Sequence, residues 1–283
     1  MNSLLKYIPL FVEKDHLYDA FEAIKTANNR VNATGDLLEE FVKSVISGCN
    51  PQEDEVTKIE KCSKIFSYLG NANNIPDAIL KDGDAIEIKK VQSLNSDLAL
   101  NSSYPKDMLR HDDTRIKNEV KQLENGAWRE KNLYYIVGYI SKKTNQLISL
   151  LVLDGALYAA RGETYQGLAN SISSTLNRSS DIQWEVTNEL AKIKRVDPLD
   201  RTDLRIRGMW HIKSPFKVFG EYLDADHNLS SFYTLVSKNK YESICEEDRK
   251  AIENHPLLTV TPIKLQNPNN GANLIEAILV RKK

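Results

Sequence analysis

The chain contains few cysteines and no long apolar segment. Only Cys49, Cys62 and Cys245 occur among 283 residues. They are too few for the disulfide framework of a small secreted protein, and their odd number is typical of a reducing compartment. No two of them form a C-x-x-C pair, and no nearby histidine spacing indicates zinc. No run approaches the roughly 18 apolar residues of a membrane span. These absences predict a soluble, intracellular protein that does not act on a membrane.

An excess of either charge is also missing. The chain has 38 Lys and Arg against 39 Asp and Glu, a formal net charge of -1. This balance excludes a polycationic coat protein, and by itself it argues mildly against nucleic-acid binding. The charges are segregated, however, because residues 1–60 have 6 basic and 11 acidic side chains while residues 191–217 have 8 basic and 3 acidic. The basic stretch therefore restores nucleic acid as a candidate ligand.

The hydrophobic pattern predicts an α/β fold. With 41% hydrophobic and 27% charged residues, the composition is that of an ordinary globular protein. Apolar periodicity and turn signals predict helices at 15–28, 34–48, 51–69, 114–125 and 163–177, and strands at 77–81, 85–91, 133–140, 147–153, 204–212 and 274–280. Residues 92–113 are polar and are expected to be irregular. We expect a central mixed β-sheet flanked by helices.

Three ionisable residues stand out in the segment PDAILKDGDAIEIKK, namely Asp77, Glu87 and Lys89. Asp82-Gly83 lies between two alternating runs and is a strong β-hairpin signal. Side chains alternate faces along a strand, so Glu87 and Lys89 project together while the isoleucines between and before them enter the core. Across the hairpin, Asp77 is expected on the same side if the register allows.

Two carboxylates and one ammonium at this spacing suit metal-assisted cleavage of a phosphodiester. Asp77 and Glu87 offer the hard oxygen ligands that Mg²⁺ prefers. The metal would polarise the scissile phosphate and lower the pKa of a bound water. Lys89 would position that water and offset charge in the transition state. On residue types alone, the alternative is a solvated hairpin with ordinary surface charges.

The same segment resembles the PD-(D/E)xK signature of restriction-endonuclease-like nucleases, with Pro76-Asp77, nine residues, and then Glu87-Ile88-Lys89. Four further segments resemble type II restriction enzymes, particularly the NgoPII-like group that cuts GGCC sites: 35–39, 99–106, 133–138 and 204–210. Together they span roughly residues 33–215 in the expected order, which is far more specific than the three charged residues alone.

The resemblance implies a single restriction-endonuclease-like domain over residues 1–283, with a helical part at 1–70, a catalytic core sheet at 71–160 and DNA-recognition elements in 161–283. It implies a type II site-specific deoxyribonuclease that uses Mg²⁺, acts on double-stranded DNA and leaves 5′-phosphate ends, in the cytoplasm of a prokaryote. A homodimer is expected because a palindromic DNA site has the same two-fold symmetry as a dimer of identical subunits. A cognate DNA methyltransferase would be the functional partner, without physical association.

The resemblance also assigns roles within the site. Asp77 and Glu87 would bind the metal, the Ile88 carbonyl is a third candidate ligand, and Lys89 would orient the attacking water. A glutamate on a preceding helix often completes the metal site in these enzymes, which favours Glu39 because it lies at the margin of an apolar helical stripe. The alternative for Glu39 is an ordinary glutamate of an amphipathic helix.

A polar loop just after the predicted catalytic strand is expected to contact DNA. Asn101, Ser102, Ser103 and Lys106 provide amide, hydroxyl and ammonium donors of the kind that bind phosphates and base edges. Long loops without secondary structure are usually binding loops or disordered segments. The alternative is an ordinary surface loop.

The basic stretch is expected to contact DNA as well. Arg205 and Arg207 share one face of a predicted strand, and Trp210 follows them. Arginine binds guanine bidentately in the major groove, so an arginine pair suits a G·C-rich site. Phosphate contact and a solvated strand face are the alternatives for these arginines.

Two other functions remain open at this point. A structure-specific nuclease of recombination or repair would keep the fold but nick branched DNA instead of producing discrete fragments. A non-catalytic DNA-binding module with a decayed nuclease site would bind without cleaving. The complete Asp77, Glu87 and Lys89 set argues against the second of these.

Overall fold

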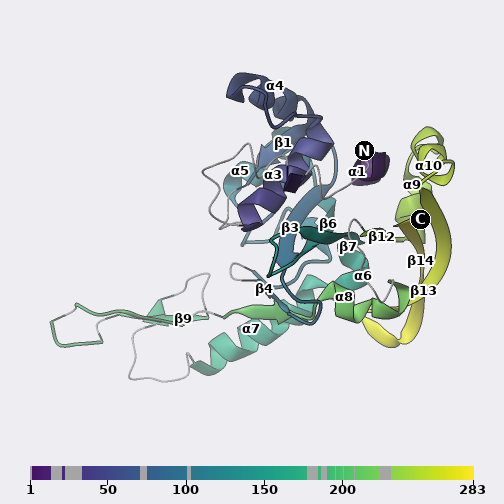
Figure 1. The fold of residues 1–283 in the computed structure, drawn as a ribbon. Helices are drawn as coiled ribbons and strands as arrows, with labels where there is room; N and C mark the ends of the chain where they lie inside the picture. The colour runs from purple at the N-terminus through teal and green to yellow at the C-terminus, as the bar shows by residue number, and fades with distance from the viewer. Residues whose placement is uncertain are drawn as a thin grey trace.

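The computed structural model describes residues 2–13, 21–22, 34–70, 75–100, 103–176, 184–185, 190–194, 196–199, 201–206, 208–223 and 231–283. Its centre is a mixed β-sheet to which nine described strands belong (Figure 1). These strands are β1 Phe66–Leu69, β2 Ala78–Leu80, β3 Ala85–Val91, β5 Met108–Arg110, β6 Glu130–Ile140, β7 Leu147–Asp154, β12 Ser231–Ser237, β13 Leu258–Asn267 and β14 Asn270–Lys282.

The strand order explains why the middle of the sheet is so apolar. The strands lie in the order β1-β2-β3-β6-β7-β12-β14-β13, and β5 pairs with β6 beside this row. The β3–β6 and β7–β12 pairs are parallel and the other pairs are antiparallel. Strands β6 and β7 lie in the middle and are covered on both faces, as their continuous apolar runs predict. The prediction of a mixed central sheet flanked by helices is confirmed.

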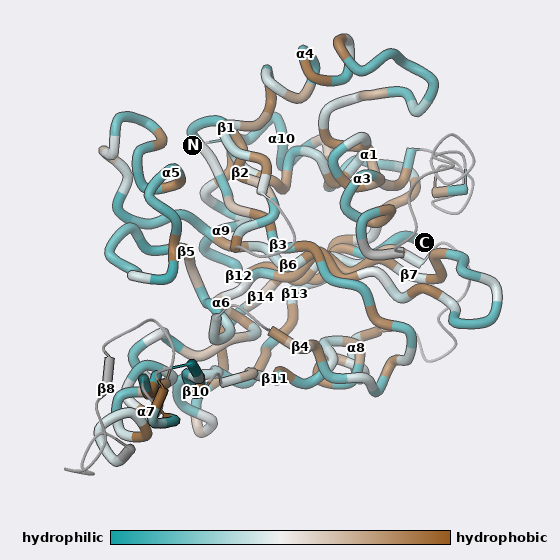
Figure 2. The backbone as a smooth tube through the Cα atoms, turned by 90° about the vertical axis from the view of Figure 1, so that its left-hand side faces the viewer, coloured by the Kyte–Doolittle hydropathy of each residue, from teal (hydrophilic) through white to brown (hydrophobic). Residues whose placement is uncertain are grey.

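The described part of the chain also forms helices and short turns of helix, several of which pack on the two faces of this sheet. They are α1 Ile8–Glu13, α3 Thr34–Ser47, α4 Glu55–Ile65, α5 Asn118–Lys121, α6 Gly155–Tyr158, α7 Gly162–Leu176, α8 Pro215–Val218, α9 Lys238–Ser243 and α10 Glu246–Glu253, with 3-10 turns at Leu4–Tyr7, Leu123–Gly126 and Gly220–Tyr222. One apolar cluster contains side chains of α1, α3 and α10, and a second contains side chains of α5, α6 and α8. Figure 2 shows the central strands as the most hydrophobic part of the backbone.

Strand β3 shows how one strand serves both clusters. Ile86 and Ile88 belong to the first cluster, whereas Ala85 and Val91 belong to the second. Every second residue of a strand lies on the same face, so Glu87 and Lys89 share the face of Ala85 and Val91, which packs against the second cluster. The predicted division between core isoleucines and projecting charges is therefore confirmed.

Helix α3 packs closely on the sheet. Its apolar stripe, which includes Leu38 and Phe41, is fully buried. A Cβ added at Gly138 in β6 would lie 2.8 Å from a methyl group of Leu38. The glycine therefore lets the helix approach the strand next to β3, which brings the Glu39 region of the helix near the β2–β3 hairpin.

Two smaller sheets extend from the body. Strands β8 Trp184–Glu185, β9 Ala191–Ile193 and β10 Leu204–Ile206 form one, and β4 Leu98–Leu100 pairs with β11 Trp210–Ile212 in the other. Figure 1 shows the β8–β10 sheet projecting away from the central sheet beside α7, and we call this projection the arm. None of the described helices is both long and apolar enough to cross a bilayer.

Several predicted boundaries were wrong. The helix expected to reach residue 69 ends at Ile65, and Phe66–Leu69 forms strand β1 because it pairs with β2. The segment 92–113, expected to be irregular, contributes β4 and β5 through pairing with distant strands. The strand expected at 204–212 is two strands in different sheets.

Other predictions were only partly met. The helix expected at 114–125 is shortened to α5 and a 3-10 turn, and of the helix expected at 15–28 only residues 21–22 are described. The central sheet also extends beyond residues 71–160, because β1 and β12–β14 belong to it. Strands β12 and β13 had no prediction: β12 pairs in parallel with the distant β7, whereas β13 forms an antiparallel hairpin with the adjacent β14.

Candidate active site

The β2–β3 hairpin brings the three predicted catalytic side chains together. The Lys89 Nζ lies 2.5 Å from Oε1 of Glu87 and 3.5 Å from Oδ2 of Asp77. The Ile88 backbone N–H donates to Oδ2 of Asp77 at 2.6 Å. The Lys89 ammonium also donates to the Ile88 carbonyl at 3.1 Å. One ammonium, two carboxylates and one carbonyl therefore share a single small volume.

Burial dominates the electrostatics of this group. Asp77 is 3% exposed and Glu87 is 2% exposed. Burial raises the pKa of Glu87 to about 7, against the opposing effect of Lys89, and the nearby Asp77 charge raises it further. Burial alone would lower the pKa of Lys89, but the Glu87 and Asp77 carboxylates raise it above the ordinary value. Burial therefore disfavours the charged form of Glu87, and Lys89 is the cation within reach that opposes this effect.

The donor set fits a hard divalent cation. Oε2 of Glu87 is buried and has no hydrogen-bond partner among the described residues. Carboxylate and carbonyl oxygens are the ligands that Mg²⁺ prefers, usually with several waters. No three Asp, Glu, His or Cys side chains converge as a metal-binding group in the described part of the chain. A cation here would therefore rely on Asp77, Glu87 and the Ile88 carbonyl.

Glu39 lies near this group but is not part of it. The side chain is half-buried on α3, and its carboxylate is 3.1 Å from Lys43 Nζ, one helical turn away. Burial raises the pKa of Glu39, and the charge of Asp77 raises it further. Glu39 is thus within electrostatic reach of the hairpin while its closest charged partner is Lys43.

The loop after β4 is fixed to the strand beside the hairpin. In the β3–β6 pairing, Tyr135 lies opposite Glu87. The buried Tyr135 hydroxyl accepts from the Lys106 backbone N–H at 2.9 Å and donates to the Lys106 carbonyl at 3.0 Å. One hydroxyl therefore holds both polar backbone groups of Lys106 against β6, the strand next to β3.

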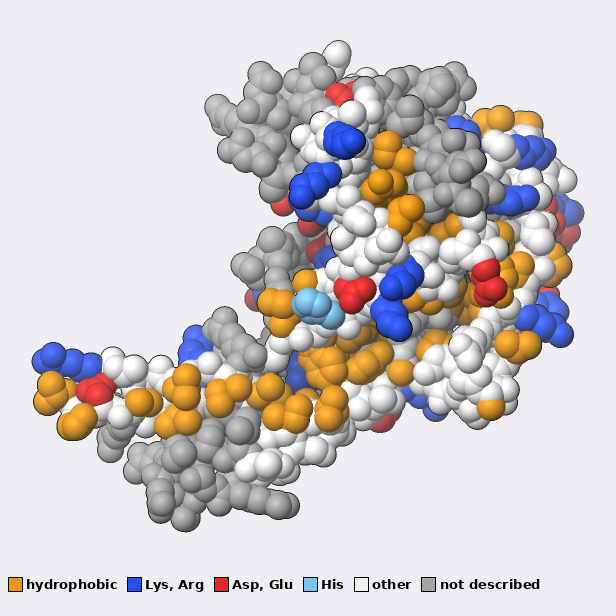
Figure 3. All heavy atoms as spheres, turned by 60° about the horizontal axis from the view of Figure 1, so that its bottom comes forward, with side chains coloured by type: hydrophobic (Ala, Val, Ile, Leu, Met, Phe, Trp, Pro, Cys, Tyr) orange, Lys and Arg blue, Asp and Glu red, His pale blue; other side chains and the backbone are white. Residues whose placement is uncertain are grey.

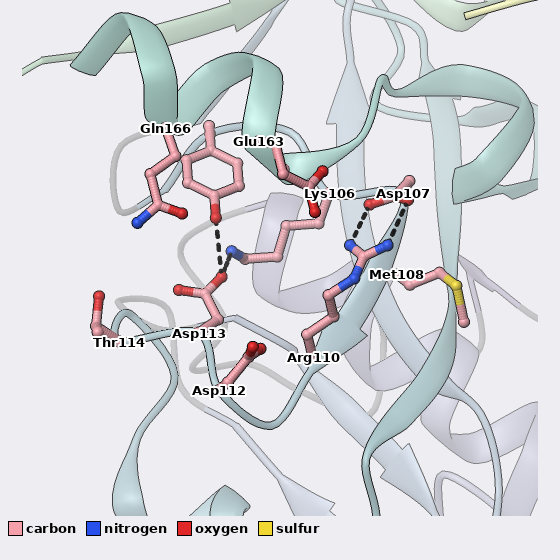
Figure 4. Close-up of a pocket in the computed structure, with 11 residues that line it drawn as sticks. Lys106, Asp107, Met108, Arg110, Asp112, Asp113, Thr114, Glu163 and Gln166 are labelled. Carbon is pink, nitrogen blue, oxygen red and sulfur yellow. Dashed lines mark hydrogen bonds and ion pairs between the residues drawn. The ribbon is translucent and has the colours of Figure 1, made fainter. Parts of the chain in front are cut away.

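A polar pocket of about 210 Å³ opens beside this loop (Figure 4). Figure 4 shows Lys106 turned toward Asp113, with which it forms an ion pair, and Arg110 turned toward Asp107. Both nitrogens of the Arg110 fork donate to the Asp107 carboxylate, at 2.7 and 2.9 Å. The cationic groups of the pocket are thus paired within its own wall.

Of the four residues in this loop that were predicted to bind DNA, two are described by the structure, and both are buried. Asn101 and Ser102 lie outside the described residues. Ser103 is buried, and its Oγ has no hydrogen-bond partner in the described part of the chain. Lys106 is 2% exposed, and its ammonium lies 4.2 Å from the centre of the Tyr104 ring. The Lys106 side chain therefore supports the loop from inside, where its ammonium is paired with Asp113.

The residues predicted from the basic stretch are also separated. Arg205 is exposed on β10 of the arm, opposite Lys192 in β9. Arg207 lies outside the described residues. Trp210 lies in β11, where its ring contacts Tyr165 at 5.5 Å and Tyr104 at 6.4 Å between centroids. Trp210 thus belongs to an aromatic cluster beside the pocket, whereas Arg205 is placed on the arm.

Some residues that shape the site were missed in the sequence. Tyr135 is one of many apolar or aromatic residues in its strand, and Asp84 follows the turn glycine without a motif of its own. Both side chains act through partners far away in the chain, at Lys106 for the first and at Ser3, Leu4 and Asn132 for the second. The one local signal for Asp84 is the sequence Asp82-Gly83-Asp84, in which a second aspartate follows the turn glycine.

Comparison with known proteins gives a consistent family. The model of the NgoPII restriction endonuclease family matches residues 3–267. The curated type II restriction enzyme NgoPII of Neisseria gonorrhoeae is 40% identical over 260 residues, which cover 92% of each chain. No solved structure matches. Restriction endonucleases cut DNA at specific sequences, and the predicted hairpin site lies inside the matched region. This chain belongs to the NgoPII restriction endonuclease family.

Proposed function

We propose that this restriction endonuclease cleaves double-stranded DNA at the β2–β3 hairpin, with Asp77, Glu87 and Lys89 as its catalytic residues and Mg²⁺ as its metal. One observation carries the proposal: two buried carboxylates meet one ammonium within 3.5 Å on a hairpin of a restriction-enzyme chain. The buried Glu87 oxygen without a partner supports a cation at the same place.

Each side chain has a distinct role in this proposal. Asp77 and Glu87 hold the metal with the Ile88 carbonyl, and Glu39 is a further candidate ligand. The chemistry that bound Mg²⁺ supplies is Lewis-acid activation of a phosphate oxygen and of water. Lys89 stays protonated beside its two carboxylates, so it donates a hydrogen bond that orients the attacking water and offsets charge at phosphorus. In-line attack leaves a 5′-phosphate and a 3′-hydroxyl.

The arm and the hollow beside it are the proposed DNA-binding region. Figure 3 shows a hollowed face between the projecting arm and the body of the molecule. Arg205 lies on the arm, within a stretch that has 8 basic and 3 acidic side chains over residues 191–217. We propose that Arg205 contacts DNA here, and the sequence extends this proposal to Asn101, Ser102, Ser103, Arg207 and Trp210. GGCC is the proposed recognition sequence, which suits arginine contacts with guanine.

The biological setting completes the proposal. We propose a homodimer, because a palindromic site presents the same sequence to two symmetric subunits. A methyltransferase of the same specificity would protect host DNA in the prokaryotic cytoplasm. We further propose one domain over residues 1–283, since β12–β14 complete the sheet that contains the catalytic hairpin.

The test is to separate binding from cleavage. Asp77→Ala and Lys89→Ala should abolish cleavage in Mg²⁺ while leaving specific DNA binding measurable in Ca²⁺. Lys90→Ala is the matched control, because Lys90 is the next residue of β3, exposed and on the opposite face. Full cleavage by Asp77→Ala or Lys89→Ala would refute the assignment of the site.

A further inference from the structure

The first residues of the chain pair with the turn of the catalytic hairpin. The Asn2 N–H donates to the Asp82 carbonyl at 3.0 Å, and the Asp84 N–H donates to the Asn2 carbonyl at 3.2 Å. Asn2 and Gly83 form a parallel bridge. The chain start therefore acts as a short strand laid along the turn between β2 and β3.

The Asp84 side chain extends this contact into the core. It is 0% exposed. Its Oδ2 accepts from Ser3 Oγ at 3.1 Å and from the Leu4 N–H at 2.8 Å. Its Oδ1 accepts from Nδ2 of Asn132, in β6, at 2.9 Å. One buried carboxylate thus joins the chain start, the hairpin turn and the strand beside the hairpin, and these donors offset its desolvation.

The turn packs closely against residues Asn2–Leu4. A Cβ added at Gly83 would lie 2.1 Å from the Asn2 carbonyl oxygen. The buried Lys131 ammonium donates to the Gly83 carbonyl at 3.3 Å. Asp82 has a φ of 51°, a left-handed conformation. The turn therefore packs directly against residues Asn2–Leu4. We call these three residues together with Asp84 the clasp.

Few residue pairs join β2 directly to β3, although β2 also pairs with β1 and β3 with β6. The β2–β3 pairing consists of two residue pairs, Ala78 with Ile86 and Ile79 with Ala85. In addition, the Asp77 N–H donates to the carbonyl of Ile86 at 3.0 Å, and Ile86 is the residue before Glu87. Because few contacts join the two strands directly, the turn at their other end contributes to the position of Asp77 relative to Glu87.

We propose that Asp84 is a positioning residue of the cleavage site, and that the clasp sets the distance between Asp77 and Glu87. The inference rests on the proposed catalytic role of the hairpin. Asp84 reaches no reacting group itself and acts through the β2–β3 register. A displacement of about 1 Å in a catalytic group is enough to slow a reaction roughly 100-fold.

The main test is Asp84→Asn, which keeps the shape of the side chain. We expect kcat to fall about 10- to 100-fold while KM for cognate DNA stays unchanged, because the turn shifts the catalytic groups and leaves the arm intact. Amide hydrogen exchange of residues 78–91 should accelerate in the same variant, without metal or DNA present. Both readouts are measured well below the melting temperature.

Asp154→Asn is the matched control. Asp154 is also 0% exposed, and it accepts from Ala156 N, from Ser237 and from Lys240. It ends β7, outside the hairpin. This variant should lose stability but keep its kcat and its hairpin exchange rates. If Asp84→Asn only loses stability as Asp154→Asn does, with kcat and exchange unchanged, the positioning role is wrong.

Ser3→Ala is the milder variant if Asp84→Asn does not fold. It removes one hydrogen bond to Asp84, so kcat should fall by about 2- to 10-fold, and this loss should not add to that of Asp84→Asn. An unchanged kcat in Ser3→Ala would also overturn the role. Asp77→Ala keeps the two proposals apart: if it is inactive while the clasp variants are fully active, the catalytic assignment stands and only the clasp fails.

Discussion

The β2–β3 hairpin, the proposed cleavage site, and the arm both contain short antiparallel strand pairs, yet their surroundings differ sharply. In the hairpin, β2 is buried throughout, and the charges of Asp77, Glu87 and Lys89 lie against one another. On the arm, Val196, Leu199 and Leu204 expose about half or more of their side chains, at 53, 67 and 48%. The hairpin is determined by the protein around it, whereas much of the arm's surface faces outward.

This difference is what the roles proposed for the two regions, cleavage for the hairpin and DNA recognition for the arm, would require. Cleavage needs groups held to within a fraction of an ångström, which a packed sheet with buried hydrogen bonds provides. Recognition needs side chains that reach a partner, and such groups usually lie on projecting segments. Changes in the hairpin should therefore affect chemistry or stability, and changes on the arm should affect binding.

The largest effect is expected from Glu87→Gln, which removes one charge and keeps the shape. We expect kcat to fall about 1,000-fold or more, since a lost metal ligand forfeits several kcal/mol of transition-state stabilisation. Single-turnover cleavage of a cognate duplex measures this. DNA binding in Ca²⁺ should remain measurable, and wild-type kcat in this variant would remove Glu87 from the mechanism.

The next contrast concerns stability. Ile79→Ala in β2 should lower the free energy of unfolding by about 2 to 5 kcal/mol, because its fully buried side chain leaves a cavity. Leu199→Ala on the arm should change it by about 0.5 kcal/mol or less, because that side chain is exposed. Urea unfolding of both variants checks the pair, and equal losses would mean that the arm is packed as tightly as the hairpin.

A smaller effect is expected from Arg205→Ala. If Arg205 reads a base, affinity for the cognate site should fall about 5- to 100-fold, discrimination at one base pair should relax, and the melting temperature should not change. Lys217→Ala, in the same basic stretch but on α8, is the control. A uniform loss on all sequences with a shallower salt dependence would indicate phosphate contact instead.

The smallest effect is expected from Glu39→Gln. As a candidate ligand within electrostatic reach of Asp77, it should lower kcat about 10-fold and raise the Mg²⁺ concentration that half-saturates cleavage. Glu40→Gln on the same helix should leave both values unchanged. If the two variants behave alike, Glu39 is an ordinary helix glutamate paired with Lys43.

The hairpin could be predicted from the sequence because its signals are local. Asp82-Gly83 marks the turn, and alternation in β3 places Glu87 and Lys89 on one face. Helix α3 and strands β6 and β7 also follow from periodicity within single segments. In each case the residues that decide the structure are neighbours in the chain.

The remaining features depend on partners that a local pattern does not contain. Phe66–Leu69 continues a helical pattern but becomes a strand because β2 is available to pair with it. Asp84 looks like a turn residue until Ser3 and Asn132 reach it from 81 and 48 positions away. Lys106 looks like a surface donor, yet Tyr135 and Asp113 enclose it. Tertiary contacts override local propensity in all three places.

The central claim is that this hairpin cuts DNA at one defined sequence. The most direct measurement is to digest a fully sequenced phage genome in Mg²⁺ with the wild-type chain and with Asp77→Ala, and to map every end. We predict discrete fragments whose 5′-phosphate ends share one short palindrome, and an uncut genome with Asp77→Ala. Nicks at branched or unrelated positions, or the same fragments from both proteins, would contradict the account.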